Sequence, residues 1–228
     1  MSLNAKNYKT ESKFPKPEPL SAGAYPARVV QILGLGLQKQ NPFKGVEKPP
    51  KFQLMVVYEL LDEFMLDEEG NEDTTKPRWI REDFPMNGLD SDLATSTKRY
   101  TALDPEMKHE GDWAQLGGTA CTVTLVRSAP SKKDGTIYNN VGSVSSMRQK
   151  DADKAPELVN PVTIFDYSSN DTTTFLSMPD WIQAKVKEAL DFDGSPLAKA
   201  LEGHSPSDKK EDKSVDKEEE KSSDDADW

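Results

Sequence analysis

The chain has almost none of the residues that form disulfides or hold structural metals. Cys121 is the only cysteine, and His109 and His204 are the only histidines. A structural zinc site takes about four Cys or His ligands and a disulfide takes two cysteines, so this chain alone can build neither. We therefore expect no metal and no cofactor, and we expect a reducing compartment, the cytoplasm, as the setting of the protein.

The N-terminal region has no long hydrophobic run. Residues 1–19 contain scattered lysines, glutamates and prolines. This composition excludes a signal peptide or a membrane-spanning helix there, so we expect no membrane partner. The prolines in the stretch 13–19 (KFPKPEP) interrupt both helices and central strands. We expect residues 1–20 to be a disordered leader.

Residue sets that carry out catalysis are also missing. The sequence has no Ser, His and Asp set at the spacing of a known family, and Cys121 alternates with apolar residues, as a small buried side chain does. Gly34 and Gly36 lack the lysine and the helix that a phosphate-binding loop requires. We expect a protein that is not an enzyme and has no catalytic residues. A metal-dependent nuclease that uses the acidic residues at 62–69 is a distant alternative, and it would degrade DNA with magnesium.

Positive charge is scarce as well. The formal net charge is −11, and the ten acids and five lysines from residue 205 onward supply −5 of it, which leaves −6 for the rest of the chain. Dedicated binders of duplex DNA usually carry a dominant basic face. Any contact with nucleic acid must therefore come from a local group of lysines and arginines.

The C-terminal residues 204–228 form a charged stretch that ends in an aromatic residue. We expect this tail to be disordered, because it has few apolar residues and many charges. A tail that only increases solubility needs no exposed indole. We therefore expect the tail to bind partner proteins, and to compete for a groove that binds a nucleic-acid backbone. The predicted partner-binding residues are Asp224, Asp225, Asp227 and Trp228.

Three segments in the first half of the chain have the pattern of β-strands. Residues 27–37 are rich in Val, Ile and Leu, and Gly34 and Gly36 mark positions for a bulge or bend. Residues 52–60 (FQLMVVYEL) have apolar side chains at every second position, which is typical of a half-buried strand with Phe52, Leu54, Val56, Tyr58 and Leu60 on one face. Residues 78–84 predict a third strand, with Ile80 and Phe84 on one face and Trp79 and Arg81 on the other.

One helix and two more strands follow. Residues 90–103 predict a helix with a cap at Asp90 or Ser91. Residues 120–127 alternate as a strand, and the turn at 131–135 (SKKDG) leads to a last strand over 136–147. Five strands with a helix between the third and the fourth is the order of an OB-fold, a small Greek-key barrel. We expect a mainly β protein with an OB-fold-like five-stranded barrel over residues 21–150; an unrelated β-sandwich is the alternative.

Residues 151–203 predict a C-terminal helical appendage. Residues 162–165 have the composition of an edge strand, residues 179–190 form an amphipathic helix pattern with Ile182, Val186 and Leu190 at spacing four, and residues 197–201 fit one more helical turn. This segment is too short to fold alone. We expect it to pack on the barrel.

Basic and aromatic side chains fall on the elements with which an OB-fold binds oligonucleotides. Lysines and arginines there would contact phosphates while the aromatic rings stack on unpaired bases, so binding would be nearly independent of sequence. Packing is the alternative role for Trp79, and anchoring of its loop is the alternative for Phe43. The predicted DNA-binding residues are Lys39, Phe43, Lys44, Lys48, Lys51, Arg78, Trp79, Arg81, Arg127, Lys132, Lys133 and Tyr138.

Several short motifs resemble a known family over residues 25–201. They are YPARVV at 25–30, PFKG at 42–45, KPP at 48–50, YE at 58–59, KRY at 98–100 and YNNV at 138–141. Together they look like the single-stranded-DNA-binding proteins of tailed bacteriophages. The resemblance implies an OB-fold that coats single-stranded DNA in phage DNA replication, recombination and repair, in the host cell cytoplasm. It also implies an acidic tail that recruits replication or recombination proteins and competes with DNA.

A second class of function fits the same pattern. A protein-interaction adaptor or a virion-associated structural protein would use the same barrel and tail without binding nucleic acid. It predicts an apolar rather than a basic groove, and no DNA binding that depends on salt.

Overall fold

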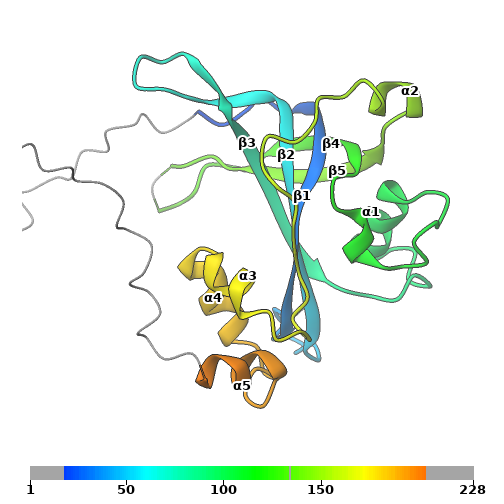
Figure 1. The fold of residues 1–228 in the computed structure, drawn as a ribbon, viewed down its shortest axis with the longest axis vertical. Helices are drawn as coiled ribbons and strands as arrows, with labels where there is room; N and C mark the ends of the chain where they lie inside the picture. Colours follow the sequence, from blue (N-terminus) through cyan, green and yellow to red (C-terminus); the bar gives the residue numbers. More distant parts are fainter. Residues whose placement is uncertain (1–17, 134, 204–228) are drawn as a thin grey trace, which may run out of the picture.

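The computed structural model describes residues 18–133 and 135–203. Most of the expected leader and all of the expected tail, residues 204–228, lie outside the described residues. The described part is mainly β, with one six-stranded sheet and a few short helices. Figure 1 shows the long strands β1 and β2 running through the centre, with helices on both sides of them.

Five strands of the sheet are antiparallel neighbours in the order β3-β2-β1-β4-β5. Their bounds are β1 (Gly23–Gln38), β2 (Lys51–Leu66), β3 (Glu72–Pro85), β4 (Ala120–Arg127) and β5 (Asn139–Ser146). The short strand β6 (Thr163–Phe165) pairs in parallel with β1. Residues 23–28 of β1 pair with β4 and residues 31–33 pair with β6, so the two strands share one edge of β1 in succession.

The helices lie in two groups along the chain. Between β3 and β4 come α1 (Thr95–Leu103) and the 3-10 turn η2 (Trp113–Leu116). After β5 come α2 (Gln149–Ala152), α3 (Thr172–Ser177), α4 (Asp180–Lys187) and α5 (Pro196–Glu202). The predicted order of three strands, a helix and two strands is therefore confirmed.

Two irregularities bend β1. Its register against β2 shifts between Val29 and Gln31 and again between Gly34 and Leu37. Gly36, in the second shift, has a φ of +75°, a backbone conformation that glycine adopts without strain. A Cβ there would lie 2.6 Å from Ala189 Cβ and 2.7 Å from the Tyr167 ring. The predicted bulge at this glycine is confirmed, and the bend lets the chain beyond β6 pack closely on the strand.

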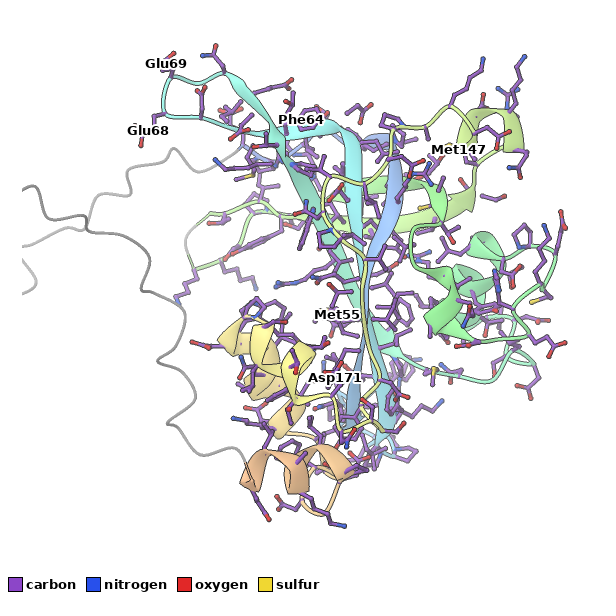
Figure 2. All side chains as sticks on the ribbon, viewed as in Figure 1. Met55, Phe64, Glu68, Glu69, Met147 and Asp171 are labelled. Atoms are coloured by element: carbon purple, nitrogen blue, oxygen red, sulfur yellow. The ribbon has the colours of Figure 1, made fainter. Side chains whose placement is uncertain are left out.

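The sheet has a hydrophobic cluster on each face. The first cluster lies between the sheet and α1, and its side chains include Val56, Tyr58, Leu60, Phe84, Tyr100, Trp113, Val123 and Leu125. The second cluster lies between β1, β2 and the C-terminal helices, and includes Val30, Leu33, Met55, Val57, Phe165, Phe175, Ile182, Val186 and Leu197. Figures 1 and 2 show α3 and α4 on the opposite side of the strands from α1, with Met55 labelled at the sheet.

The prediction that β2 is half-buried is wrong. Residues 54–61 are all buried, because the C-terminal helices cover the face that the pattern leaves open. Phe52 also departs from the expected face, since its ring packs against Tyr167 in the second cluster. The second register shift of β1 lies opposite this end of β2.

A buried polar network joins four elements of the first cluster. Arg99 of α1 donates from Nε to Glu82 Oε1 at 2.7 Å and from Nη2 to Glu82 Oε2 at 3.0 Å. The hydroxyl of Tyr58 in β2 donates to the same carboxylate at 2.9 Å, and Arg99 Nη2 donates to the carbonyl of Gly142 in β5 at 3.4 Å. The network thus links β2, β3 and β5 through α1. Backbone pairing does not join β3 and β5 in the described residues, although the two strands approach each other.

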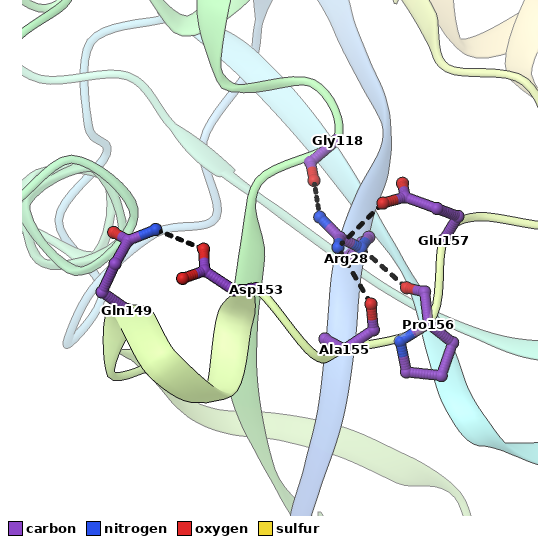
Figure 3. Close-up of polar contacts among 7 residues, drawn as sticks. All are labelled: Arg28, Gly118, Gln149, Asp153, Ala155, Pro156 and Glu157. Carbon is purple, nitrogen blue, oxygen red and sulfur yellow. Dashed lines mark hydrogen bonds and ion pairs between the residues drawn. The ribbon is translucent and has the colours of Figure 1, made fainter.

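Arg28 fixes the chain where it returns over β1 (Figure 3). Its guanidinium donates to the carbonyls of Gly118 at 3.0 Å, Pro156 at 2.8 Å and Ala155 at 3.2 Å. Glu157 lies 3.6 Å from Nη2. These contacts place the segment after α2 on the sheet before it reaches β6.

Several boundaries differ from the predicted ones. The helix α1 begins at Thr95 rather than near Asp90, because residues 88–94 form turns with hydrogen bonds from Ser91 N to Gly88 O and from Ala94 N to Ser91 O. β3 is longer than predicted, and β5 begins at Asn139. Leu20, inside the expected leader, is buried in the first cluster. The predicted strand at 162–165 and the predicted turn at 197–201 are confirmed as β6 and α5, whereas α3 and η2 have no counterpart among the predictions.

Candidate nucleic-acid interface

The loop between β1 and β2 carries a two-residue hairpin. Phe43 and Val46 exchange backbone hydrogen bonds of 2.9 and 3.0 Å. Lys44 and Gly45, between them, have φ of +51° and +77°. Positive φ at both central residues defines a type I′ turn, which favours glycine at the second position. The turn therefore fixes Phe43 at the tip of the loop, where its side chain is 58% exposed.

Lysines surround the exposed ring. Lys48 Nζ lies 4.9 Å and Lys44 Nζ lies 5.4 Å from the centroid of the Phe43 ring, within the range of cation–π contacts. Lys51 donates to the side chain of Asn87. Lys48 and Lys51 also line a pocket with Gln40, Pro49, Pro85, Asn87, Leu93, Ala94 and Thr95. The loop thus holds the predicted residues Phe43, Lys44 and Lys48, Lys51 follows it as the first residue of β2, and Lys39 is exposed at its start.

Two more predicted residues lie together on the outer face of β3. Ile80 and Phe84 pack in the first cluster, so Trp79 and Arg81 point to the opposite side, as predicted. The Trp79 indole donates from Nε1 to Glu59 Oε2 at 3.0 Å while 41% of the residue stays exposed. Arg81 stacks on the ring of Trp181 from α4, with Cζ 4.0 Å from the ring centroid.

Glu59 has a buried carboxylate, which the distribution of charged residues in the sequence does not predict. It is only 1% exposed, and besides Trp79 it accepts hydrogen bonds of 2.7 Å from the backbone N–H of Val159 and from Asn160 Nδ2. Three N–H donors therefore satisfy a carboxylate inside the protein. This arrangement ties Trp79 to the segment that leads into β6.

Arg78 does not share the surface of Trp79 and Arg81. It is the neighbour of Trp79 in β3, and side chains alternate along a strand. Its Nη2 donates to the carbonyl of Glu18 at 2.9 Å. Arg78 therefore contacts the start of the described chain rather than α4.

The remaining predicted residues lie on the hairpin between β4 and β5. Ser128 donates its backbone N–H to Tyr138 O at 2.8 Å, and Ser131 donates to Thr136 O at 2.9 Å, so the hairpin extends past both strands. Arg127, Lys132 and Lys133 are exposed, and Tyr138 is 54% exposed. In Figure 1 this hairpin projects from the sheet at a different place from the β1–β2 loop at the bottom of the view.

The predicted residues thus form three groups, on the β1–β2 loop, the outer face of β3 and the β4–β5 hairpin, and Arg78 lies apart from all three. Within the part of the chain that the structure describes, no hydrogen bond, ion pair or ring contact joins one group to another. The contact of α4 with β3 is a feature that sequence reasoning missed. The sequence feature that could have indicated this contact is Trp181, because it is an aromatic residue that lies beside the apolar stripe of Ile182 and Val186 rather than in it.

The acidic β2–β3 hairpin shows no arrangement for metal binding. Glu68 and Glu69 lie at its tip (Figure 2). Hydrogen bonds from Lys76 and Thr75 lower the pKa of Asp73 to about 2, while partial burial raises the pKa of Asp62. Among residues 18–133 and 135–203, no group of three or more His, Cys, Asp or Glu side chains is close enough to hold a metal ion.

Two further observations bear on the sequence expectations. Burial raises the pKa of Cys121 to about 12, so its thiol is protonated and unreactive at neutral pH. In the described chain, no helix has both the length and the apolar character needed to cross a bilayer. The predicted partner-binding residues Asp224, Asp225, Asp227 and Trp228 lie outside the described residues.

Comparison with known proteins adds no relative. No family model, no curated protein and no solved structure matches this chain.

Proposed function

We propose that this protein binds single-stranded DNA without sequence preference, through an OB-fold. The sheet order β3-β2-β1-β4-β5, with α1 between β3 and β4, supports this fold, and so does the approach of β3 to β5. An OB-fold is a partly open barrel that binds oligonucleotides on the face of its second and third strands and on the loops β1–β2 and β4–β5. Those are the elements that carry the predicted DNA-binding residues.

The observation that carries the proposal is the β1–β2 loop. A type I′ turn holds Phe43 in the open with lysine ammonium groups at 4.9 and 5.4 Å from its ring. A ring on a rigid turn offers a stacking surface for an unpaired base, and the lysines beside it offer contacts for the phosphates. An aromatic residue that anchored its loop by packing would be buried, and Phe43 is not.

The proposal also gives the C-terminal tail a role. Residues 204–228 would recruit replication or recombination proteins through Asp224, Asp225, Asp227 and Trp228, and would compete with DNA. In this role the protein would coat exposed strands in phage DNA replication, recombination and repair, in the cytoplasm of the host. It would have neither catalytic residues nor a cofactor.

The experiment that tests the proposal is a titration of labelled oligo-dT followed by fluorescence anisotropy at two salt concentrations. We expect binding that weakens as salt rises, since each phosphate contact on a single strand contributes about −0.7 to the slope of log K against log salt. A duplex of equal length should bind more weakly. No binding to the single strand at low salt would contradict the proposal.

Phe43→Ala tests the loop itself. We expect oligo-dT binding about 5- to 150-fold weaker, because one stacked base contributes about 1–3 kcal/mol. Val46→Ala is the matched control, since Val46 lies on the same turn, is 68% exposed and has no ring. Equal affinities of the two variants would remove Phe43 from the interface.

A protein-interaction adaptor is the second candidate, and one observation favours it. The C-terminal segment buries the outer face of β2 at Met55 and Val57, which is half of the face that an OB-fold offers to oligonucleotides. An adaptor has no need of that face. It would bind neither single strand nor duplex in the same titration.

A further inference from the structure

We propose that Trp181 of α4 is a second stacking surface for unpaired bases, next to Trp79, so that the C-terminal segment forms one side of the path of the single strand. This inference rests on the proposed function. It extends the interface from the strands and loops of the sheet to a helix that follows it in the chain.

The position of Trp181 is set by its neighbours in α4. Ile182 and Val186 are buried in the second cluster and fix the side of the helix that faces the sheet. Trp181, one residue before Ile182, lies beside this stripe and is 43% exposed. The core therefore uses only part of the indole.

Polar contacts hold both indoles in place. Arg81 lies over one face of the Trp181 ring, with Cζ 4.0 Å from the ring centroid, so a base would stack on the other face. Glu59 Oε2 accepts the indole N–H of Trp79 at 3.0 Å. Trp79 and Arg81 are two residues apart on one face of β3, which separates them by about 7 Å along the strand. Aromatic groups that are fixed before the ligand arrives lose little conformational entropy on binding.

The charges at this site suit a phosphate backbone. Lys185 of α4 forms an ion pair with Asp83 of β3 at 2.6 Å, which neutralises a carboxylate on the same face of the strand as Arg81. Arg81 forms no ion pair with any residue that the structure describes. Its charge is therefore free to attract a phosphate while its guanidinium stacks on Trp181.

Two exposed indoles, with a cation that contacts one of them and shares a strand face with the other, fit single-stranded nucleic acid. Stacking needs the face of an unpaired base, which a duplex does not expose along its length, and the cation contacts the linking phosphate. Arg81 is two residues from Trp79 on β3 and contacts Trp181 of α4. A single DNA strand with one base stacked on Trp79 of β3 would place its following base at Trp181 of α4.

Trp181→Leu in the full-length chain tests this inference. Leucine keeps an apolar side chain beside Arg81 but offers no ring, so we expect oligo-dT binding about 5- to 150-fold weaker with an unchanged circular dichroism spectrum and unfolding midpoint. Leu190→Ala is the matched control, because Leu190 is 49% exposed in the same segment and lies outside the proposed site. It should bind like the unaltered protein.

Tryptophan emission gives a second readout that does not depend on the stability of a variant. In a Trp228→Phe background, oligo-dT should quench the emission of the protein that retains Trp181 more than that of the protein that carries Trp181→Leu. Trp113 is 9% exposed and serves as an internal reference. If the unaltered protein binds oligo-dT but Trp181→Leu changes neither affinity nor quenching, Trp181 is a packing residue and the inference is wrong while the proposed function stands. If the unaltered protein binds no oligo-dT, the proposed function fails first.

Discussion

Glu59 is the residue whose surroundings decide how the C-terminal segment attaches to the sheet. Its carboxylate is 1% exposed and accepts from three donors, two of them in residues 159–160. Glu59→Ala would leave these donors without a partner, and each unmade bond to a buried group costs about 1–3 kcal/mol. We expect the free energy of unfolding to fall by roughly 3 kcal/mol or more, as measured by urea denaturation.

Glu59→Gln is the graded control for this prediction. Its amide oxygen can accept from Trp79 and Asn160 while its NH₂ group faces the N–H of Val159, so one hydrogen bond of the three is lost. We expect a loss of about 1 kcal/mol. A glutamine variant as unstable as the alanine variant would mean that the negative charge, rather than the number of acceptors, holds the segment.

At the scale of the element, the bend of β1 links the sheet to the C-terminal helices. Gly36 combines a φ of +75° with a Cβ position 2.6 Å from Ala189 and 2.7 Å from Tyr167. Gly45 has nearly the same φ, +77°, with nothing within 4 Å of its Cβ position. Gly36→Ala should lower the free energy of unfolding by about 3 kcal/mol, and Gly45→Ala by only about 1 kcal/mol. Both variants strain the backbone, but only the alanine at position 36 also overpacks against its neighbours. Equal losses in urea denaturation would show that the packing of this segment on β1 is loose.

The same element shows how far the sequence predicts this fold. Alternation within β2 and the glycines of β1 are local signals, so they predict the strands, their order and the bulge. Burial of Met55 and Val57 depends instead on helices that begin more than a hundred residues later. Two other contacts also depend on segments that are distant in the sequence. Arg81 stacks on Trp181, and Glu59 accepts hydrogen bonds from residues 159–160. The hydrophobic periodicity of one strand does not indicate which distant segment covers the face that its pattern leaves exposed.

At the scale of the whole molecule, charge separates the tail from the predicted interface. The exposed lysines of the β1–β2 loop and of the β4–β5 hairpin are positive, whereas residues 205–228 carry −5 of the net −11. Deleting residues 205–228 should therefore strengthen oligo-dT binding, most of all at low salt, where charges interact over the longest distance. Anisotropy titrations of the full and the truncated chain at two salt concentrations measure this effect.

Two tail variants distinguish competition by the negative charge of the tail from competition by its terminal aromatic residue. Changing Asp224, Asp225 and Asp227 to Asn removes three negative charges and keeps the indole, whereas Trp228→Ala keeps the charges. If the tail competes through its charge, the asparagine variant should bind oligo-dT more tightly at low salt, and the alanine variant should match the full-length protein. If the tip competes through stacking, the alanine variant should bind more tightly at both salt concentrations, because stacking depends less on ionic strength than a charge contact does. A truncated chain that binds no better than the full chain at low salt would show that the tail does not compete with DNA, and its role would then lie with partner proteins alone.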